Sequence, residues 1–223
     1  MMFTMSKRAW WLTSAMAAAF AILTLGDILS TLASLRNGTG VELNPNAARA
    51  DGGIRIGFLV LSNAVLLVPL LGAFIFGIGR AATVPAVVLT RWWRHIFDVF
   101  FIKPLDDRAR TRSPLRLVTA TTTLLNLKIV ILANNLLAAQ GHTGPVSMLA
   151  SVCTSLGLTD GTRYWTAYVF LIVPCYVAAV GISARLLRFA ANPAPTLLRF
   201  AVAVNRVKQL RTVARSMRSG GRR

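Results

Sequence analysis

The sequence predicts an all-α, polytopic membrane protein with four transmembrane helices in two hairpins, plus basic and aromatic interfacial helices. Hydrophobic residues make up 55% of the 223 positions, and the mean hydropathy is +0.59. Only 14% of residues are charged, against about 25% in an ordinary soluble domain, yet the formal net charge is +18. A soluble nucleic-acid-binding protein would be basic but not this apolar. We therefore expect an apolar part within a bilayer and a basic part at its surface, and we do not expect nucleic acid as a partner.

Four apolar segments are long enough to span a bilayer, which takes about 20 mostly apolar residues. The first follows Lys7 and Arg8, as in a signal peptide, but it is long for one and no clear Ala-x-Ala site follows, so we expect an uncleaved anchor. The four segments cover about residues 9–35, 54–78, 117–139 and 164–186. The predicted parts are a first hairpin (1–80), a cytoplasmic interfacial helix and linker (81–116), a second hairpin (117–187) and a basic amphipathic cytoplasmic tail (188–223).

Basic residues in the connections predict the orientation, because cytoplasmic loops carry an excess of Lys and Arg. Residues 80–116 carry eight of them and the chain from Arg185 onward carries ten. The connection 36–55 carries three, and the connection between the last two spans carries only Arg163. We expect a multi-pass protein of a bacterial inner membrane with cytoplasmic N- and C-termini. The bacterial assignment comes from the Ala- and Arg-rich, Lys-poor usage.

An aromatic and basic segment occupies the middle connection, where residues 83–102 read TVPAVVLTRWWRHIFDVFFI. Its charged residues recur at helical spacing, and its aromatic residues lie largely off that stripe. Because Trp favours the membrane–water boundary, we expect a helix in the interface with Trp92, Trp93 and Arg94 at the lipid surface. A cytoplasmic extension of the second span is the alternative. Residues 103–116 would then be a short charged linker broken by two prolines.

The tail repeats this combination of apolar and basic residues. Its apolar residues keep helical spacing, and beside them recur Lys208, Arg211, Arg215 and Arg218. Near an anionic leaflet each basic residue gains on the order of 1 kcal/mol. We expect the tail to bind anionic lipid and to help set the topology, with docking to protein or nucleic acid as the alternative.

A faint internal repeat relates the two predicted hairpins. ILSTLASLRNGTG at 28–40 resembles ILANNLLAAQGHTG at 131–144, and Pro69 precedes Arg80 by the same offset as Pro174 precedes Arg185. Parallel repeats of this kind occur in transporters. They also arise when two hairpins simply form a bundle, and apolar segments can match by chance.

Two charged residues inside the predicted spans are candidate functional residues, because a charge in the bilayer costs several kcal/mol and usually faces a partner or water. Asp27 lies in the outer half of the first span, on a polar stripe that includes Thr31 one turn later. Lys128 lies near the middle of the third span, where its own stripe is broken by an apolar residue and Asn126 and Asn134 form a neighbouring stripe.

We predict that Asp27 and Lys128 approach each other between the first and third spans, since an opposite charge lowers the cost of burying either one. The alternative is that both side chains snorkel to water. Asp27 and Thr31 could also bind the loop of Glu42, a cation or a polar head group. A purely structural role is the other reading, because polar residues hold helices together with hydrogen bonds worth roughly 0.6–2 kcal/mol each.

The first span and its loop also carry a recognisable pattern. Asp-x3-Thr-x6-Gly-x3-Glu-x-Asn-Pro is formed by Asp27, Thr31, Gly38, Glu42, Asn44 and Pro45. Within about residues 20–78 the chain resembles a family of small bacterial membrane proteins described only as a domain of unknown function. The resemblance implies no reaction. Asn44-Pro45 and the glycines before it are typical of a tight turn that closes a helix pair.

Motifs of known enzymes are missing from the sequence: it has no His-Glu-x-x-His, Gly-x-Ser-x-Gly or P-loop. Seven acidic residues, two separated cysteines and two distant histidines argue against a metal or cofactor site. We therefore predict a non-enzymatic accessory or scaffold subunit that binds anionic lipid, a membrane-protein partner or a second copy of itself. The alternative is a small transporter or ligand-binding protein with its polar site at Asp27 and Lys128. A lipid-modifying enzyme is a third possibility.

Overall fold

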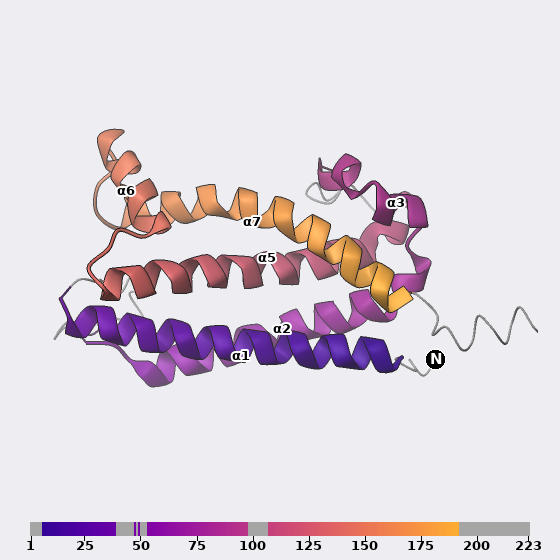
Figure 1. The fold of residues 1–223 in the computed structure, drawn as a ribbon, viewed down its shortest axis with the longest axis horizontal. Helices are drawn as coiled ribbons and strands as arrows, with labels where there is room; N and C mark the ends of the chain where they lie inside the picture. Colours follow the sequence, from indigo (N-terminus) through magenta and orange to yellow (C-terminus); the bar gives the residue numbers. More distant parts are fainter. Residues whose placement is uncertain (1–5, 39–46, 48, 50–52, 98–106, 192–223) are drawn as a thin grey trace, which may run out of the picture. The chain divides into compact units, whose positions relative to one another are not determined.

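The computed structural model describes residues 6–38, 47, 49, 53–97 and 107–191 (Figure 1). The chain divides into two compact units, Met1–Ala190 and Ala191–Arg223, and the described elements belong to the first apart from the last residue of α7. Every regular element in the described part is a helix. In chain order these are α1 Lys7–Arg36, α2 Ile56–Gly79, η1 Ala81–Thr83, α3 Ala86–Thr90, η2 Trp92–His95, α5 Asp107–Ala139, α6 Pro145–Ser155 and α7 Asp160–Ala191.

Four of these helices, α1, α2, α5 and α7, are long and apolar enough to cross a membrane. The predicted all-α class and the four candidate spans are therefore confirmed. The pairing of the spans into hairpins and the interfacial position of the remaining helices stay predictions.

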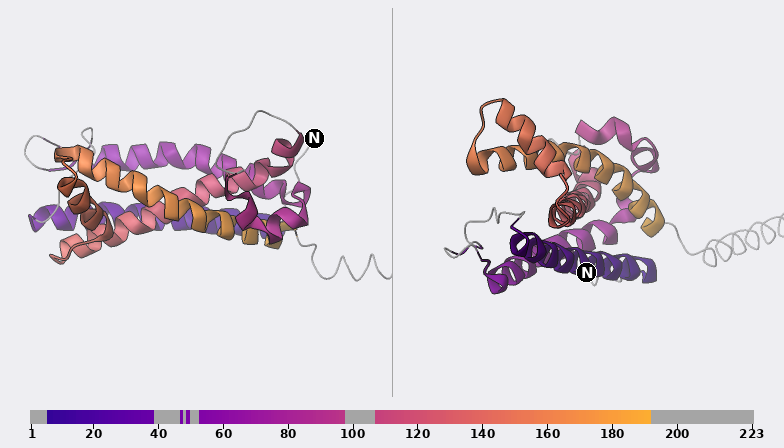
Figure 2. Two further views of the ribbon diagram at one scale, coloured as in Figure 1. Left: turned by 90° about the horizontal axis from the view of Figure 1, so that it is seen from above. Right: turned by 60° about the vertical axis from the view of Figure 1, so that its left-hand side comes forward.

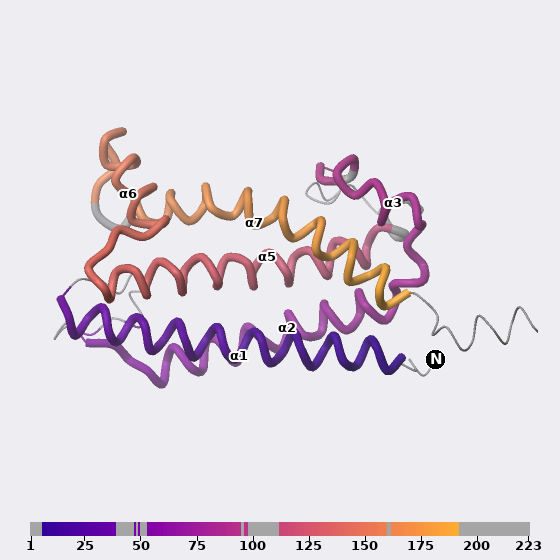
Figure 3. The backbone as a smooth tube through the Cα atoms, in the orientation of Figure 1, coloured from indigo at the N-terminus to yellow at the C-terminus, as the bar shows by residue number. Residues whose placement is uncertain are grey.

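Helix α5 is the central element of the first unit. It contacts α1, α2 and α6, and two of its side chains hydrogen-bond to α7. Helix α1 lies beside α5 and runs in the same direction (Figures 2 and 3). Their carboxyl ends are joined by the Asn37 amide, which donates to the Ala139 carbonyl at 2.9 Å. Each of these two helices ends just before a glycine with positive φ, Gly38 at 66° and Gly141 at 77°, at matching positions of the internal repeat.

Small residues allow the helices to approach closely. A side chain on Gly77 of α2 would come within 2.9 Å of the Pro114 carbonyl oxygen of α5. Gly26 of α1 packs in the same way against Leu132 of α5. The largest fully buried side chains include Phe20, Leu115, Val118 and Leu187.

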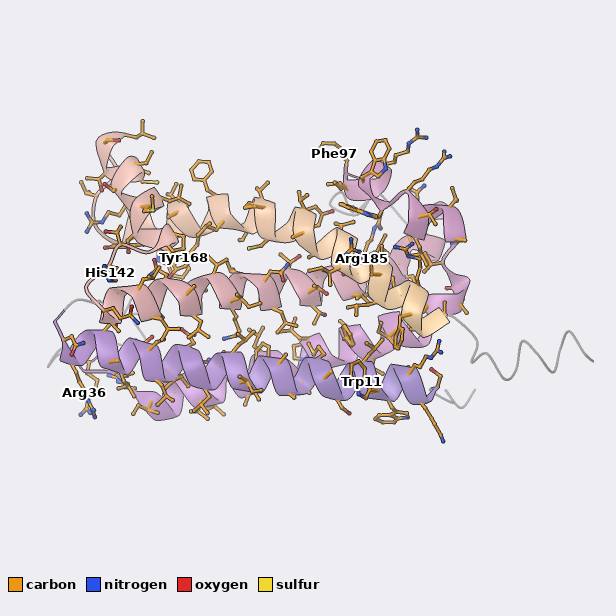
Figure 4. The ribbon with its side chains drawn as sticks, viewed as in Figure 1. Trp11, Arg36, Phe97, His142, Tyr168 and Arg185 are labelled. Atoms are coloured by element: carbon orange, nitrogen blue, oxygen red, sulfur yellow. The ribbon has the colours of Figure 1, made fainter. Side chains whose placement is uncertain are left out.

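The outward faces of the long helices are apolar. In the most apolar window of α2 only 11% of the residues are buried by protein, so most of that surface must meet lipid or another protein. Figure 4 shows Arg36 and His142 at one end of the helices, and Trp11, Phe97 and Arg185 toward the other. Trp11 is 65% exposed.

The segment after α2 differs from the prediction. In place of one helix over 83–102, η1 ends at Thr83, the short helices α3 and η2 follow, and residues 96–97 are again helical. Pro85 lacks an N–H and starts a new helix at Ala86, and Arg91 leaves the helical region with φ −110° and ψ 41°. Residues 98–106 lie outside the described part.

Helix α5 begins well before the predicted start at Leu117 and includes much of the expected charged linker. It passes through Pro114, although proline inside a helix removes one backbone hydrogen bond. Pro114 is buried, and its carbonyl packs where Gly77 has no side chain. Helix α6 was not predicted at all, because its 11 residues are too few to span a bilayer.

Candidate functional site: a polar cluster between α1 and α5

Four polar residues meet on the facing sides of α1 and α5, and we call Asp27, Thr31, Lys128 and Asn135 the polar cluster. Asp27 and Thr31 are four residues apart on α1, so their side chains lie on one face. The neighbouring Ser30 and Ser34 donate to the backbone carbonyls of Asp27 and Thr31, each at 3.0 Å. The two serine hydroxyls thus bond within α1, whereas the side chains of Asp27 and Thr31 bond to α5.

The two opposite charges lie close together. Lys128 Nζ is 3.9 Å from Asp27 Oδ2, with side chains 12% and 23% exposed. The ammonium also lies 5.1 Å from the centre of the Phe20 ring, within the range of a cation–π contact. The predicted approach of Asp27 and Lys128 is therefore confirmed, and the snorkelling alternative is not needed to explain their burial.

Asn135 completes the cluster from α5. Its Nδ2 donates to Asp27 Oδ1 at 2.9 Å and to Thr31 Oγ1 at 3.1 Å. It occupies the position two turns after Lys128, on the same face. Our prediction did not include Asn135 as a site residue. An apolar residue four positions before Lys128 interrupts the polar stripe on that face of the helix, so the stripe looked broken. Its spacing from Lys128 was the signal that could have identified it.

The cluster is electrically balanced, and three of its four side chains are joined by hydrogen bonds. One carboxylate faces one ammonium, and the amide satisfies the second carboxylate oxygen, an arrangement that offsets part of the cost of burying the charges. Asp27 is the only acidic residue whose side chain is described. Thr24, one turn before Asp27, has a buried hydroxyl without a hydrogen-bond partner among the described residues.

The other two predicted residues of the third span lie on α5 but contact different helices. Asn126 donates to the Cys175 carbonyl of α7 at 3.1 Å. Asn134 accepts from the backbone N–H groups of Val146 and Ser147, at 3.0 and 3.2 Å, and so caps the first turn of α6. Neither residue contacts the Asp27–Lys128 pair in a described hydrogen bond or ion pair.

The remaining predicted residues divide into two groups. Trp92, Trp93 and Arg94 lie in η2. Trp93 is 58% exposed, and the Arg94 guanidinium lies 5.0 Å from its ring centre. Trp92 packs against Gly181 of α7 instead. Outside the described residues lie Glu42, Asn44, Lys208, Arg211, Arg215 and Arg218.

The fold and the cluster thus define an all-helical protein with four helices that could cross a membrane and with a balanced polar contact inside its apolar part. Within the described ranges, no group of three or more His, Cys, Asp or Glu could hold a metal ion. Comparison with family models, curated proteins and solved structures finds no match.

Proposed function

We propose that the protein is a non-enzymatic integral protein of a bacterial inner membrane that acts as an accessory or scaffold subunit. The observation that carries this proposal is the set of hydrogen bonds made by three asparagine side chains of α5, which are buried or half-buried. Asn126, Asn134 and Asn135 each hydrogen-bond to a different neighbouring helix. Polar groups arranged in this way hold a bundle together. The outward faces of the long helices remain apolar and are suited to lipid or to a partner's transmembrane helix.

Contacts with the membrane surface follow from the basic and aromatic segments. We propose that η2 and the tail lie on the cytoplasmic side, where Arg94 and the tail's basic residues would bind anionic head groups. The exposed Trp93 would rest at the same boundary. Both termini are cytoplasmic in this arrangement.

A second candidate function is transport or binding of a small polar ligand at the cluster. Ionisable residues inside a membrane protein commonly mark a pathway for an ion or substrate. The unpartnered hydroxyl of Thr24 beside Asp27 favours this candidate, because a buried donor normally has a protein, water or ligand partner. Four spans are few for a pathway, so a transporter of this size would act as an oligomer.

Native mass spectrometry of the protein, gently extracted from its own membrane, tests the two candidates. The wild type is compared with Asp27→Asn, which keeps the size of the side chain and removes its charge. A stoichiometric protein partner on both would support the scaffold. A small molecule or cation carried by the wild type and lost in the variant would replace the scaffold proposal with ligand binding.

A further inference from the structure

A pocket of about 430 Å³ lies between α6 and the first turns of α7, apart from the polar cluster. Its lining is unusually rich in hydrogen-bonding groups: Ser147, Ser151, Thr154, Ser155, Arg163 and Tyr164, together with Ala150. No carboxylate is described in this lining. The site therefore combines one guanidinium with five hydroxyl groups, which is the chemistry that binds a phosphate.

The arrangement of α6 produces this lining. The hydroxyl residues recur every three or four positions and share one face of the helix. An adjacent face buries Val146, Ala150 and Cys153. Asn134 caps the start of the helix, and Val146 and Ala150 pack against Ala167 of α7. The hydroxyl residues therefore border the pocket between the two helices.

The described residues use only part of the hydrogen-bonding capacity of the Arg163 guanidinium. One guanidinium nitrogen makes a long contact of 3.5 Å to Thr154 Oγ1. Its Nε is buried and has no partner among the described residues. The Tyr164 ring lies 4.9 Å from the guanidinium carbon and restricts its position. A guanidinium offers five N–H donors in a planar fork that matches two phosphate oxygens.

We propose that this pocket binds a phosphate group, held by the Arg163 guanidinium and by hydroxyls of α6. The hydroxyls of Thr154 and Ser155 donate to carbonyls of their own helix at 2.9 and 2.7 Å. A rotation about χ1 exchanges these bonds for bonds to a ligand oxygen. Nothing in this inference depends on the scaffold proposal.

A membrane phospholipid is one source of such a phosphate. Arg163 lies at the start of the candidate span Thr162–Ala191, at the level where lipid phosphates lie if α7 crosses the bilayer. Below it on α7, Trp165, Val169 and Phe170 are exposed and apolar, a surface suited to acyl chains. A free phosphate or phosphorylated solute is the other source.

Native mass spectrometry of the delipidated full chain tests the site with three probes. These are phosphatidylglycerol, a diacylglycerol with the same acyl chains, and inorganic phosphate. The variants are Arg163→Gln, which removes the guanidinium, and Ser151→Leu, which fills the pocket from an exposed position. Arg36→Gln is the matched control, because it removes one positive charge from an exposed site at the end of α1, which Asn37 joins to the end of α5.

We expect the wild type and Arg36→Gln to retain phosphatidylglycerol and to release the diacylglycerol. Arg163→Gln and Ser151→Leu should each retain roughly tenfold less phosphatidylglycerol, the size expected for a lost charge-assisted contact. Lipid bound by the tail is common to all variants and cancels in the comparison. Arg163-dependent binding of inorganic phosphate with no retained lipid would assign the site to a free phosphate. Equal retention of both phosphate-bearing probes by the wild type and by both pocket variants would overturn the proposal.

Discussion

Exchange of the two charges in the polar cluster is the sharpest test of how α1 and α5 are joined. Asp27→Lys and Lys128→Asp each place two like charges where the native side chains lie 3.9 Å apart. The double exchange restores an opposite pair in the reverse order. We expect both single variants to be strongly destabilised and the double variant to recover most of the loss.

The expected size follows from the distance and the burial. At 3.9 Å and an effective dielectric constant of about 20, two unit charges interact by about 4 kcal/mol. Breaking a buried pair by changing one partner typically costs about 3–5 kcal/mol. The exchange loses the Asn135–Asp27 hydrogen bond and the Lys128–Phe20 contact, worth roughly 1 kcal/mol each. We therefore expect the double variant to recover at least about 2 kcal/mol relative to either single variant.

Equilibrium unfolding in mixed micelles of mild detergent and SDS, followed by the fluorescence of the five tryptophans, gives the free energies. The control is Asp27→Lys with Arg36→Asp, which has the same net charge as the exchange but introduces its new acid at an exposed position near the end of α1. Rescue by the control as complete as by the Lys128 exchange would refute the specific pairing. So would a double variant no more stable than the singles.

Two further predictions concern other helix contacts. Gly77→Ala should lower the free energy of unfolding by about 1–3 kcal/mol, because the new methyl group meets the Pro114 carbonyl. The control is Gly72→Ala on the same helix, where the methyl group has open space. It should be near neutral in the same unfolding assay. Equal effects would show that α2 does not pack on α5 as described. Asn134→Ala removes the cap of α6 and should lower the stability of that helix by about 1 kcal/mol. Because α6 then opens more often, the buried thiol of Cys153 should react faster with a maleimide than in the wild type. An unchanged rate would mean that the cap does not hold α6 in place.

The long elements of the fold could be predicted because hydropathy and length are properties of the chain itself. A span needs about 20 apolar residues wherever its neighbours lie, so four segments could be identified. The ends were less predictable. Pro114 and the charges before it looked like a linker, but α5 runs through them, and Gly77 of another helix packs against the Pro114 carbonyl. Helix α6 was missed because it is short and depends on a cap from Asn134, which precedes it by more than ten residues.

The candidate site was predicted in part for the same reason. Two opposite charges in apolar segments must be neutralised somewhere, and this physical requirement identified Asp27 and Lys128. The amide that joins them could not be chosen by composition, since Asn126, Asn134 and Asn135 are chemically identical. Which one faces α1 depends on the rotation of α5 within the bundle, and that rotation is set by contacts with several helices.

The position of α5 also explains why its polar residues did not form one clear stripe. An amphipathic pattern with a single polar face is typical of a helix that has water on one side, whereas α5 contacts or bonds to α1, α2, α6 and α7, besides the short η1. Thr121 bonds to α2, Thr122 and Asn126 bond to α7, Asn134 caps α6, and Asn135 binds α1. The polar residues are therefore spread around the helix, one or two toward each neighbour. A broken stripe on an apolar helix can thus indicate a central position in a bundle, and this central position is what we would expect of the helix that holds a scaffold together.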